Sequence, residues 1–424
     1  MRNLKFIHAA DLHLDSPLRG LSQYPGAPVK ELRGATRRSL ENLVSLAKDE
    51  KVAFVLIAGD VYDGDWKDYN TGLFFLNQMS ILREAGIQVY LIKGNHDAKS
   101  QITRSLTLPS NVHDFSTSHP ETKYLPEHAV AIHGQGFQNQ SVSEDISSRY
   151  PAAIPGCFNI GLLHTSATGR PGHENYAPCT LEGLLSKGYD YWALGHVHHR
   201  EVISTDPYIV FPGNTQGRHI RETDSKGCTL VEVIDGKITS VEHKPLDVLQ
   251  WLHCTIDANC SSTVADLIDI VCKHIEHEIA DLDELRLVAL RIRITGTFGA
   301  HREVFDNPAE FENEIRQALN DFGGGRLWLE KLSIRTRAAI DLEEVVLRDD
   351  PMGHLLQFVR AVPQDSELLA ELMDDFRDLR LRLPQELATG QDPVLRDDQS
   401  FITDLLPDVE NDLVATLFAH EEAR

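Results

Sequence analysis

Short apolar runs alternate with amphipathic stretches over the first 245 residues of the chain. The run Val52–Ala58 is apolar and rich in β-branched residues, which is typical of a buried strand, whereas Asn70–Ala85 has the periodicity of a helix. The same criteria predict a helix at Val29–Glu50 and strands at Leu4–Ala10, Ile87–Lys93, Ala129–His133, Phe158–His164, Tyr189–Leu194, Tyr208–Phe211, Cys228–Ile234 and Ile238–His243. This order predicts a sheet-based α/β core covered by helices.

A second pattern begins near Leu249. It predicts a strand, a helix, a strand, a helix and a strand at Trp251–Ile256, Ser262–Ile279, Leu287–Thr295, Asn307–Phe322 and Leu327–Ile334. Ser262 is expected to start the first helix, Pro308 to lie in the first turn of the second, and Gly323 to follow its end. This βαβαβ pattern predicts a separate small domain.

The sequence after Ile340 is helical in pattern. Asp350–Pro351 starts one expected helix, and Ser366–Leu381 forms another. One stripe of that helix carries Leu368, Leu372, Phe376 and Leu379, and it either packs on the body or docks a partner. Residues Ala388–Gln399 are expected to form a linker. The predicted domains are therefore 1–248, 249–338 and 339–424.

Charge is unevenly distributed along the 424 residues, whose formal net charge is −23. Residues 341–424 hold 21 acidic and 7 basic side chains, so they carry −14 of that total. An acidic total argues against broad electrostatic binding of nucleic acid, although it leaves room for a local basic track. The acidic tail favours a protein-binding segment or a solvated face.

The beginning of the chain has no signal-peptide pattern, and no apolar run reaches the ~20 residues that a membrane span needs. We therefore expect a cytoplasmic protein with no membrane contact. The six cysteines, at 157, 179, 228, 254, 260 and 272, form no CxxC pair and are expected to be buried thiols.

Five polar clusters each follow an expected apolar strand. They are Asp11-x-His13, Gly59-Asp60-Val61-Tyr62-Asp63, Gly94-Asn95-His96-Asp97, His164 and Gly195-His196-Val197-His198. Loops at the carboxyl ends of strands form the binding crevice of an α/β sheet, so these clusters can converge. Taken singly, most have an ordinary explanation as turns or a core histidine. Their joint occurrence at strand ends favours a shared site.

The residue types of the five clusters suit hard to borderline metals. Carboxylates, an amide oxygen and imidazoles bind Mn, Fe or Zn, and the clusters contain no thiolate. A single carboxylate, Asp60, can bridge two ions. Two ions ~3.5–4 Å apart can clamp a phosphoryl group and generate a nucleophile from water near neutral pH.

The order DxH, GDxxD, GNHD, H, GHxH resembles that of the calcineurin-like metallophosphoesterase superfamily. The resemblance implies a four-layer β-sandwich flanked by helices. It implies one metal held by Asp11, His13, Asp60 and His198, and a second held by Asp60, Asn95, His164 and His196. It further implies that His96 is catalytic and that Asp97 is its carboxylate partner. The expected cofactor is a pair of divalent ions, with Mn²⁺ first and Fe or Mg as alternatives.

Longer motifs narrow the resemblance. HAADLHLDSPLRGL, YAPC, GYDYWALGHVHHRE, FPGNTQGRHIRE and KGC are similar to the YhaO-type DNA repair exonucleases, which are relatives of the nuclease subunit of the SbcC–SbcD complex. This similarity covers about residues 1–245. It implies DNA as the substrate, an SMC-like or AAA-type ATPase partner docked on the helical tail, a DNA-capping role for the βαβαβ domain, and a homodimer.

Several cations near the motifs are candidates for contact with substrate phosphates, with surface solvation as the alternative. They are Arg200, Arg218, His219 and Arg221, with His199 beside them. Lys30, Arg33, Arg37 and Arg38 share one expected helix and form either a basic DNA track or a solvated face. Tyr62 and Asp63 are candidates to support Asp60, or simply turn residues.

Three functions stay open from the sequence. The leading one is a two-metal DNA exonuclease or endonuclease in DNA repair that works with an ATPase. The second is a phosphodiesterase or phosphatase that acts on a small molecule or a phosphoprotein at the same site. The third is a DNA-binding or scaffold subunit with little activity, against which the intact set of candidate ligands argues.

Overall fold

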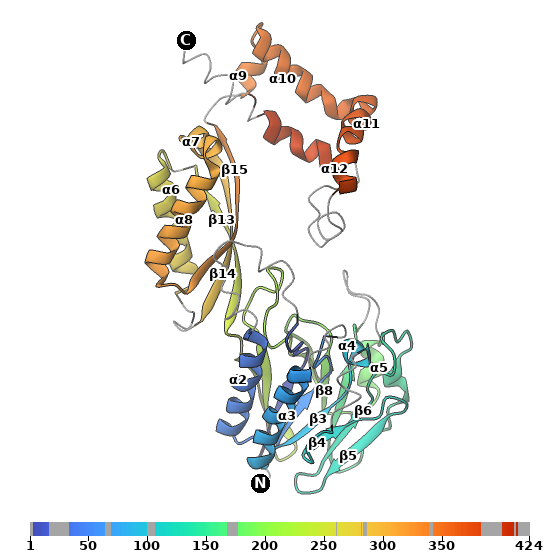
Figure 1. Cartoon of the computed structure of the whole chain (residues 1–424). Coiled ribbons are helices and arrows are strands. Elements are labelled where there is room, and N and C mark those ends of the chain that lie inside the picture. Colours follow the sequence, from blue (N-terminus) through green and yellow to red (C-terminus); the bar gives the residue numbers. More distant parts are fainter. Residues whose placement is uncertain are drawn as a thin grey trace. The chain divides into compact units, whose positions relative to one another are not determined.

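The computed structural model describes residues 3–16, 34–63, 69–99, 107–167, 177–259, 261–280, 282, 286–338, 342–382, 401–410 and 413. The chain divides into two compact units (Figure 1). Unit 1 holds Met1–His253, Leu282–Leu290 and Arg326–Glu330, and unit 2 holds Cys254–Asp281, Arg291–Gly325 and Lys331–Arg424. The domain boundaries expected at 248 and 338 stay predictions.

Unit 1 contains two six-stranded sheets. The first has the order β12-β11-β1-β2-β3-β4 and the second has the order β5-β6-β7-β8-β10-β9. The strands of the first sheet are β1 (Asn3–Ala9), β2 (Phe54–Ile57), β3 (Gln88–Leu91), β4 (Val112–Asp114), β11 (Gly227–Ile234) and β12 (Lys237–Pro245). Those of the second sheet are β5 (Glu121–Leu125), β6 (Val130–Gly134), β7 (Phe158–His164), β8 (Tyr191–Gly195), β9 (Glu201–Thr205) and β10 (Tyr208–Phe211).

Parallel pairing dominates the middle of both sheets. Strands β1 to β4 pair in parallel, and so do β6, β7, β8 and β10. Parallel strands need helical crossovers, which explains the alternation of strand and helix patterns in the sequence. Because the strands run in one direction, their carboxyl ends meet at one edge of each sheet.

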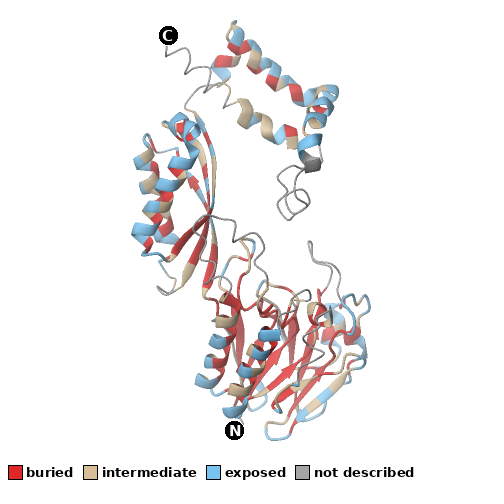
Figure 2. Ribbon diagram, in the orientation of Figure 1, coloured by how far each residue is buried: buried red, intermediate tan, exposed pale blue. Residues whose placement is uncertain are grey.

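Three apolar layers hold unit 1 together. Helices α2 (Ala35–Asp49) and α3 (Tyr69–Glu84) pack on the outer face of the first sheet through Leu40, Leu43, Phe75 and Met79. A second cluster fills the space between the sheets, and a third lies outside the second sheet against α5 (Leu181–Leu185) and the 3₁₀ turn Ile146–Arg149. The fold is therefore the expected four-layer sandwich, with its strands buried on both faces (Figure 2).

The elements of unit 1 that hydropathy does not predict are short. Strands β4, β5 and β9 carry mostly polar or half-exposed residues, and each lies at or near the edge of its sheet. An edge strand is covered less than a central one, so its sequence shows no apolar run. The part of the expected helix before residue 34 lies outside the described residues.

A three-stranded sheet follows, with the order β13-β14-β15. Its strands are β13 (Leu249–Asp257), β14 (Leu287–Phe298) and β15 (Leu327–Ala338), and its helices are α6 (Val264–Glu278), α7 (His301–Asp306) and α8 (Pro308–Gly323). The expected βαβαβ order is present, with α7 added. Thr263, rather than Ser262, caps α6 in a reciprocal capping box with Asp266, and the left-handed residue that ends α8 is Gly324 rather than Gly323.

The last described segments are helical. They are α9 (Leu342–Val346), α10 (Pro351–Ala361), the 3₁₀ turn Val362–Gln364, α11 (Ser366–Asp375), α12 (Arg377–Arg382) and residues 401–410. The single helix expected at Ser366–Leu381 is interrupted at Phe376. Three residues of its apolar stripe, Leu368, Leu372 and Phe376, pack with Ile402, whereas Leu379 is exposed. The expected linker 388–399 lies outside the described residues.

Within the described residues, no helix combines the length and the apolar character that crossing a membrane requires. Five cysteines are described, and all five are free thiols. Cys179, Cys228 and Cys254 are buried as expected, whereas Cys157 and Cys272 are half-buried. Cys260 lies outside the described residues.

Candidate metal centre

The candidate ligands of unit 1 come from the carboxyl ends of five strands. Asp11 and His13 follow β1, Asp60 follows β2, and Asn95 opens the short helix α4 (Asn95–Lys99) after β3. His164 is the last residue of β7, and His196 and His198 follow β8. The topology therefore explains why clusters so far apart in the sequence lie together.

Three overlapping groups of ligand atoms lie at this edge, and within each group all ligand atoms lie within 4.8 Å of one another. Asp11, His13 and His198 form the first group, and Asp60, His164 and His196 form the third. The second group, made of His13, Asp60 and His96, shares a residue with each of the others. The Nε2 atoms of His13 and His198 are 3.2 Å apart. Asp60 Oδ2 lies 3.4 Å from His164 Nε2 and 4.0 Å from His13 Nε2, so its carboxylate stands between the groups. Asn95 Oδ1 lies 2.9 Å from His164 Nε2.

The backbone at these positions is strained. Asp11, His13, Asp60 and His196 all have positive φ, at 52°, 40°, 53° and 99°. A residue with a side chain seldom adopts such a conformation, and it costs on the order of 1–3 kcal/mol where it does. Four strained residues among seven candidate ligands indicate that the surrounding fold holds these side chains in place against local preference.

Two motif glycines permit the close approach of the loops. A Cβ on Gly94 would lie 2.2 Å from Asp60 Oδ1, and a Cβ on Gly195 would lie 1.9 Å from the carbonyl oxygen of Ala58. No side chain fits at either distance. The glycines that precede Asn95 and His196 in the sequence motifs are therefore required by the packing of the strand ends.

The ring nitrogens are oriented as metal ligands require. His164 Nδ1 donates to the carbonyl oxygen of Ala58 at 2.8 Å, and His198 Nδ1 lies 2.7 Å from Glu222 Oε1. A proton on each Nδ1 leaves the Nε2 lone pair directed at the cluster, the arrangement by which proteins orient metal-binding histidines. The Nε2 atom of His164 faces the oxygens of Asn95 and Asp60, which both act as acceptors. A cation between them would satisfy all three, and the site fits a pair of divalent ions.

Electrostatics in the cluster follow from burial and from mutual attraction. Burial alone would raise the pKa of Asp60, but the nearby imidazole of His164 outweighs it and holds that pKa well below its usual value. For His164, burial opposes protonation, and the carboxylate of Asp60 overcomes it and raises the pKa to about 9. Burial, with Arg218 nearby, lowers the pKa of His13 to about 3. Asp60 is therefore the stable negative centre of the cluster.

The carboxylate that holds His96 is Asp63. His96 Nδ1 lies 2.8 Å from Asp63 Oδ1, and this contact raises the pKa of His96 although burial opposes it. The expectation that Asp97 orients His96 stays a prediction; the described hydrogen bonds of the Asp97 carboxylate come from the backbone amides of Val61, Tyr62 and Gly94. Asp97 thus ties together the loops that carry Asp60 and Asn95. Asp63 was considered only as a support for Asp60, because the spacing GDxxD does not show where its second carboxylate points.

Of the cations expected to contact substrate, Arg218 lies in the cluster. Its guanidinium is 3.5 Å from Asp63 Oδ2 and 3.4 Å from His198 Nδ1. His219 lies beside it, 3.5 Å from Glu222, and Arg221 is exposed. Within the described residues, Arg200 forms no ion pair or side-chain hydrogen bond with the ligand cluster.

Glu222 is a residue of the site that the sequence does not predict. This buried carboxylate bonds to His198, to Asn214 Nδ2 at 2.9 Å and to the amide of Arg218 at 2.7 Å. Its only sequence signal is its place at the end of the motif FPGNTQGRHIRE. On helix α2, Arg37 forms an ion pair with Asp15 of the loop after β1, and its part in a DNA track stays a prediction. Lys30 and Arg33 lie outside the described residues.

A four-layer sandwich with three overlapping His/Asp groups at its strand ends defines a metal-dependent phosphoesterase. Residues 4–200 match the family model of the calcineurin-like phosphoesterases, and residues 251–337 match that of the middle domain of the metallophosphoesterase YhaO. An uncharacterized metallophosphoesterase YhaO of Bacillus subtilis (strain 168) is 38% identical over 275 residues, which cover 64% of this chain and 67% of that protein. The chain belongs to the calcineurin-like metallophosphoesterase family.

Solved structures give more distant similarities. The Thermus thermophilus protein TT1561 is 12% identical, with a TM-score of 0.34 over 57% of this chain and 98% of that one. A dimetal phosphatase from Danio rerio is 13% identical, with a TM-score of 0.33 over 55% of this chain and 93% of that one.

Proposed function

We propose that this chain is a two-metal phosphodiester hydrolase that acts on DNA. The observation that carries the proposal is the position of Asp60, whose carboxylate groups with His13 and His96 and also with His164 and His196. One carboxylate between two sets of imidazoles is the donor set that a two-metal site needs. Bound there, two divalent ions would neutralise the phosphoryl oxygens and activate water.

The residues around the ligands have separate tasks in such a reaction. The side chain of His96 is 38% exposed, so it can reach a substrate and donate a proton to the leaving oxygen. Asp63 holds the Nδ1 side of its ring and favours the protonated form. Arg218 presents a guanidinium that would pair with a non-bridging phosphate oxygen. Asp97 holds together the loops that carry Asp60 and Asn95.

The motif resemblance to YhaO-type exonucleases supports three parts of the proposal. They are DNA as the substrate, Mn²⁺ as the metal, and an SMC-like or AAA-type ATPase as the partner. The presence of further elements after the sandwich favours a macromolecular substrate over a small one. A hydrolase of small phosphodiesters or phosphoproteins is the second candidate, because the same ligand cluster would serve it equally well. Homodimerisation is proposed on the same resemblance, and the cytoplasmic location stays an expectation from the sequence.

The experiment compares substrates on one purified protein. End-labelled single- and double-stranded DNA and bis(p-nitrophenyl) phosphate are incubated with Mn²⁺, using the wild type, His96→Asn and the exposed-surface control His119→Asn. We expect hydrolysis of DNA and of the small diester by the wild type and the control, and a loss on the order of 10²–10⁴-fold for His96→Asn.

The outcomes separate the candidates. Cleavage of the small diester without cleavage of DNA, also in the presence of the ATPase partner, would support the small-molecule or phosphoprotein hydrolase. Unchanged hydrolysis by His96→Asn would refute its catalytic role. If the wild type hydrolyses neither substrate although metal is bound, the scaffold function replaces the proposal.

A further inference from the structure

The loop between β10 and β11 carries a buried carboxylate on which three donors converge. Glu222 Oε1 accepts a hydrogen bond from His198 Nδ1 at 2.7 Å. Glu222 Oε2 accepts from Asn214 Nδ2 at 2.9 Å and from the backbone amide of Arg218 at 2.7 Å. Since the Glu222 side chain is 7% exposed, these donors replace the water that a surface carboxylate would bind. Both oxygens of the carboxylate are therefore held in place.

One of these contacts reaches the candidate metal ligands. Because His198 Nδ1 bonds to Glu222, its Nε2 atom is left for the group that His198 forms with Asp11 and His13. A carboxylate behind a metal-binding imidazole fixes the orientation of the ring and makes it a stronger ligand. The contact between Glu222 and His198 therefore acts on the metal affinity of that group.

A second contact reaches the cation of the site. Arg218 Nη2 lies 3.8 Å from Glu222 Oε1 and 3.4 Å from His198 Nδ1, and Arg218 Nη1 lies 3.5 Å from Asp63 Oδ2. The backbone amide of Glu222 donates to the carbonyl oxygen of His219 at 2.9 Å, which closes the turn that follows Arg218. Glu222 therefore holds Arg218 at both ends, through its backbone amide and through its guanidinium.

The loop is also tied to the start of β13. Gln216 is buried, and its side-chain amide donates to the carbonyl oxygen of Leu249 at 2.6 Å. Trp251 Nε1 donates to the carbonyl oxygen of Gly217 at 3.0 Å. A Cβ on Gly217 would lie 2.8 Å from the carbonyl oxygen of Glu222, so the two sides of the loop leave no room for a side chain there. These contacts restrain the backbone that carries Glu222.

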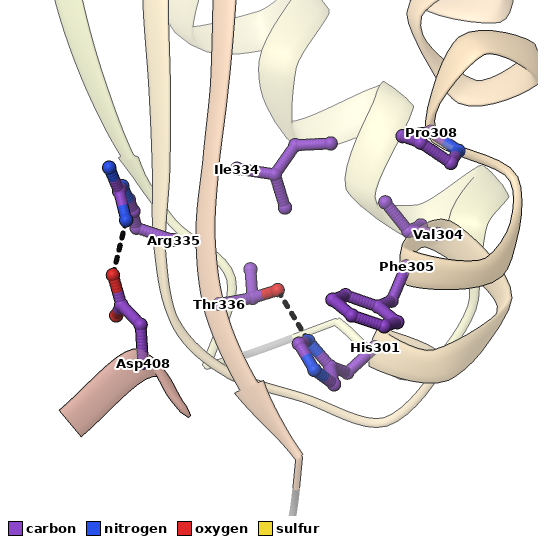
Figure 3. Close-up of a pocket in the computed structure, with 8 residues that line it drawn as sticks. All are labelled: His301, Val304, Phe305, Pro308, Ile334, Arg335, Thr336 and Asp408. Carbon is purple, nitrogen blue, oxygen red and sulfur yellow. Dashed lines mark hydrogen bonds and ion pairs between the residues drawn. The ribbon is translucent and has the colours of Figure 1, made fainter. Parts of the chain in front are cut away.

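The cavity of unit 2 shows a different arrangement of polar groups. It has a volume of about 250 Å³, and Arg335 in its lining pairs with Asp408 (Figure 3). His301 Nδ1 lies 2.8 Å from Thr336 Oγ1 in the same lining. These groups are engaged with one another, so a ligand would have to displace them. Glu222 instead joins two groups of one site that have different tasks.

We infer that Glu222 is a positioning residue with two effects: through His198 it sets the affinity for one of the two metal ions, and through Arg218 it sets the affinity for the substrate phosphate. The inference rests on the proposed function and deepens it. Glu222 itself contacts neither the metal nor the substrate in this arrangement, because its oxygens are occupied by the three donors. A carboxylate that only stabilised the loop would leave both affinities unchanged.

The test separates the two effects by two measurements. Binding of Mn²⁺ to the metal-free full-length chain is measured by titration calorimetry, and kcat and KM are measured with bis(p-nitrophenyl) phosphate at saturating Mn²⁺. The variants are Glu222→Gln, Arg218→Ala and the double variant, and Glu182→Gln at an exposed position of α5 is the control. Glutamine keeps the shape of Glu222, but its amide nitrogen turns a donor towards the donors around it. Melting temperatures are measured on every variant.

We expect Glu222→Gln to weaken the binding of one Mn²⁺ ion by about 10–100-fold and to leave the other ion unaffected. It should also raise KM by about three- to tenfold. Arg218→Ala should raise KM by about tenfold or more, because it removes a charged hydrogen bond to the substrate, and it should weaken neither ion. The double variant should have the KM of Arg218→Ala alone, since Glu222 acts on the substrate through Arg218. The control should match the wild type.

Wild-type affinity for both Mn²⁺ ions in Glu222→Gln would overturn the effect through His198. An unchanged KM in that variant, or a KM effect that adds to that of Arg218→Ala, would overturn the effect through Arg218. A lower melting temperature with both affinities unchanged would leave Glu222 as a residue that only stabilises the loop. If the wild type binds two ions but hydrolyses neither the small diester nor DNA, the proposed function fails, and the Mn²⁺ affinities still decide the effect through His198.

Discussion

The two units present their polar chemistry in different ways. In unit 1 most of the candidate ligands lie buried on loops at strand ends. Asp11 and Asp60 on these loops have a left-handed backbone conformation, and the packing around Gly94 leaves no room for a side chain at that position. In unit 2 the exposed basic residues Arg293, Lys331, Arg335 and Arg337 lie on the strands β14 and β15. The geometry of a buried, strained site depends on every neighbouring residue. On an exposed charged face, each substitution changes one charge and leaves the other residues in place.

This difference predicts how each unit responds to substitution. Changes in the strand-end cluster should abolish function or destabilise the fold, because the groups are coupled and buried. Changes on exposed or terminal positions of unit 2 should have small and additive effects.

The largest effect is expected at Asp60. Asp60→Asn removes the carboxylate that stands between the two groups of imidazoles, so phosphodiester hydrolysis should fall on the order of 10³-fold or more. Rates with bis(p-nitrophenyl) phosphate measure this, and Asp49→Asn on the surface of α2 is the control. If Asp60→Asn retained a tenth or more of the wild-type rate, Asp60 would not be a ligand shared by two metal ions.

A second prediction separates Asp63 from Asp97. Asp63→Asn should lower kcat by about 10–100-fold with little change in thermal stability, because it frees the ring of His96. Asp97→Asn should instead lower the melting temperature, because Asp97 receives three backbone amides that join two loops. If Asp97→Asn proves stable and loses kcat alone, the result would support Asp97 as the carboxylate that orients His96.

A third prediction concerns pH and lies away from the ligands. Burial raises the pKa of Asp247 to about 6 from its ordinary 3.8, although Arg286 at 3.6 Å opposes the rise. The folded state therefore holds a proton between about pH 4 and 6 that the unfolded state has lost, so stability falls as pH rises through this range.

Asp247→Asn should remove that fall. Its stability should exceed that of the wild type at pH 8 by on the order of 2 kcal/mol and match it near pH 4, since one pKa unit is about 1.4 kcal/mol. Urea denaturation at both pH values measures the difference. A variant that is less stable than the wild type at pH 8 would mean that the ion pair with Arg286 dominates.

The smallest effect is expected at the start of α6. Thr263→Ala should cost about 1 kcal/mol, because Thr263 accepts from the amide of Asp266 and closes the capping box. Ser262→Ala should cost little. Urea denaturation of both variants measures their free energies of unfolding. A larger loss of stability for Ser262→Ala than for Thr263→Ala would show that Ser262 caps the helix.

The sequence predicts the central strands, the helices and the convergence of the ligand clusters, because long apolar runs and strand-end motifs are local signals. It does not show that Asp63 faces His96 or that Glu222 holds His198, since those contacts join residues 33 and 24 positions apart on different loops. Arg200 and Arg218 look alike in the sequence, yet only Arg218 reaches the cluster. Edge strands such as β5 and the break at Phe376 have no hydropathy signal.

The most direct test of the account is the metal content of the purified chain. After dialysis against Mn²⁺, elemental analysis should find two ions per chain in the wild type and at most one in Asp60→Asn, with His119→Asn as the control. Two ions in the wild type and their loss in Asp60→Asn are the predicted result. A wild type that binds one ion or none, or an Asp60→Asn variant that keeps both, would contradict a two-metal centre bridged by Asp60.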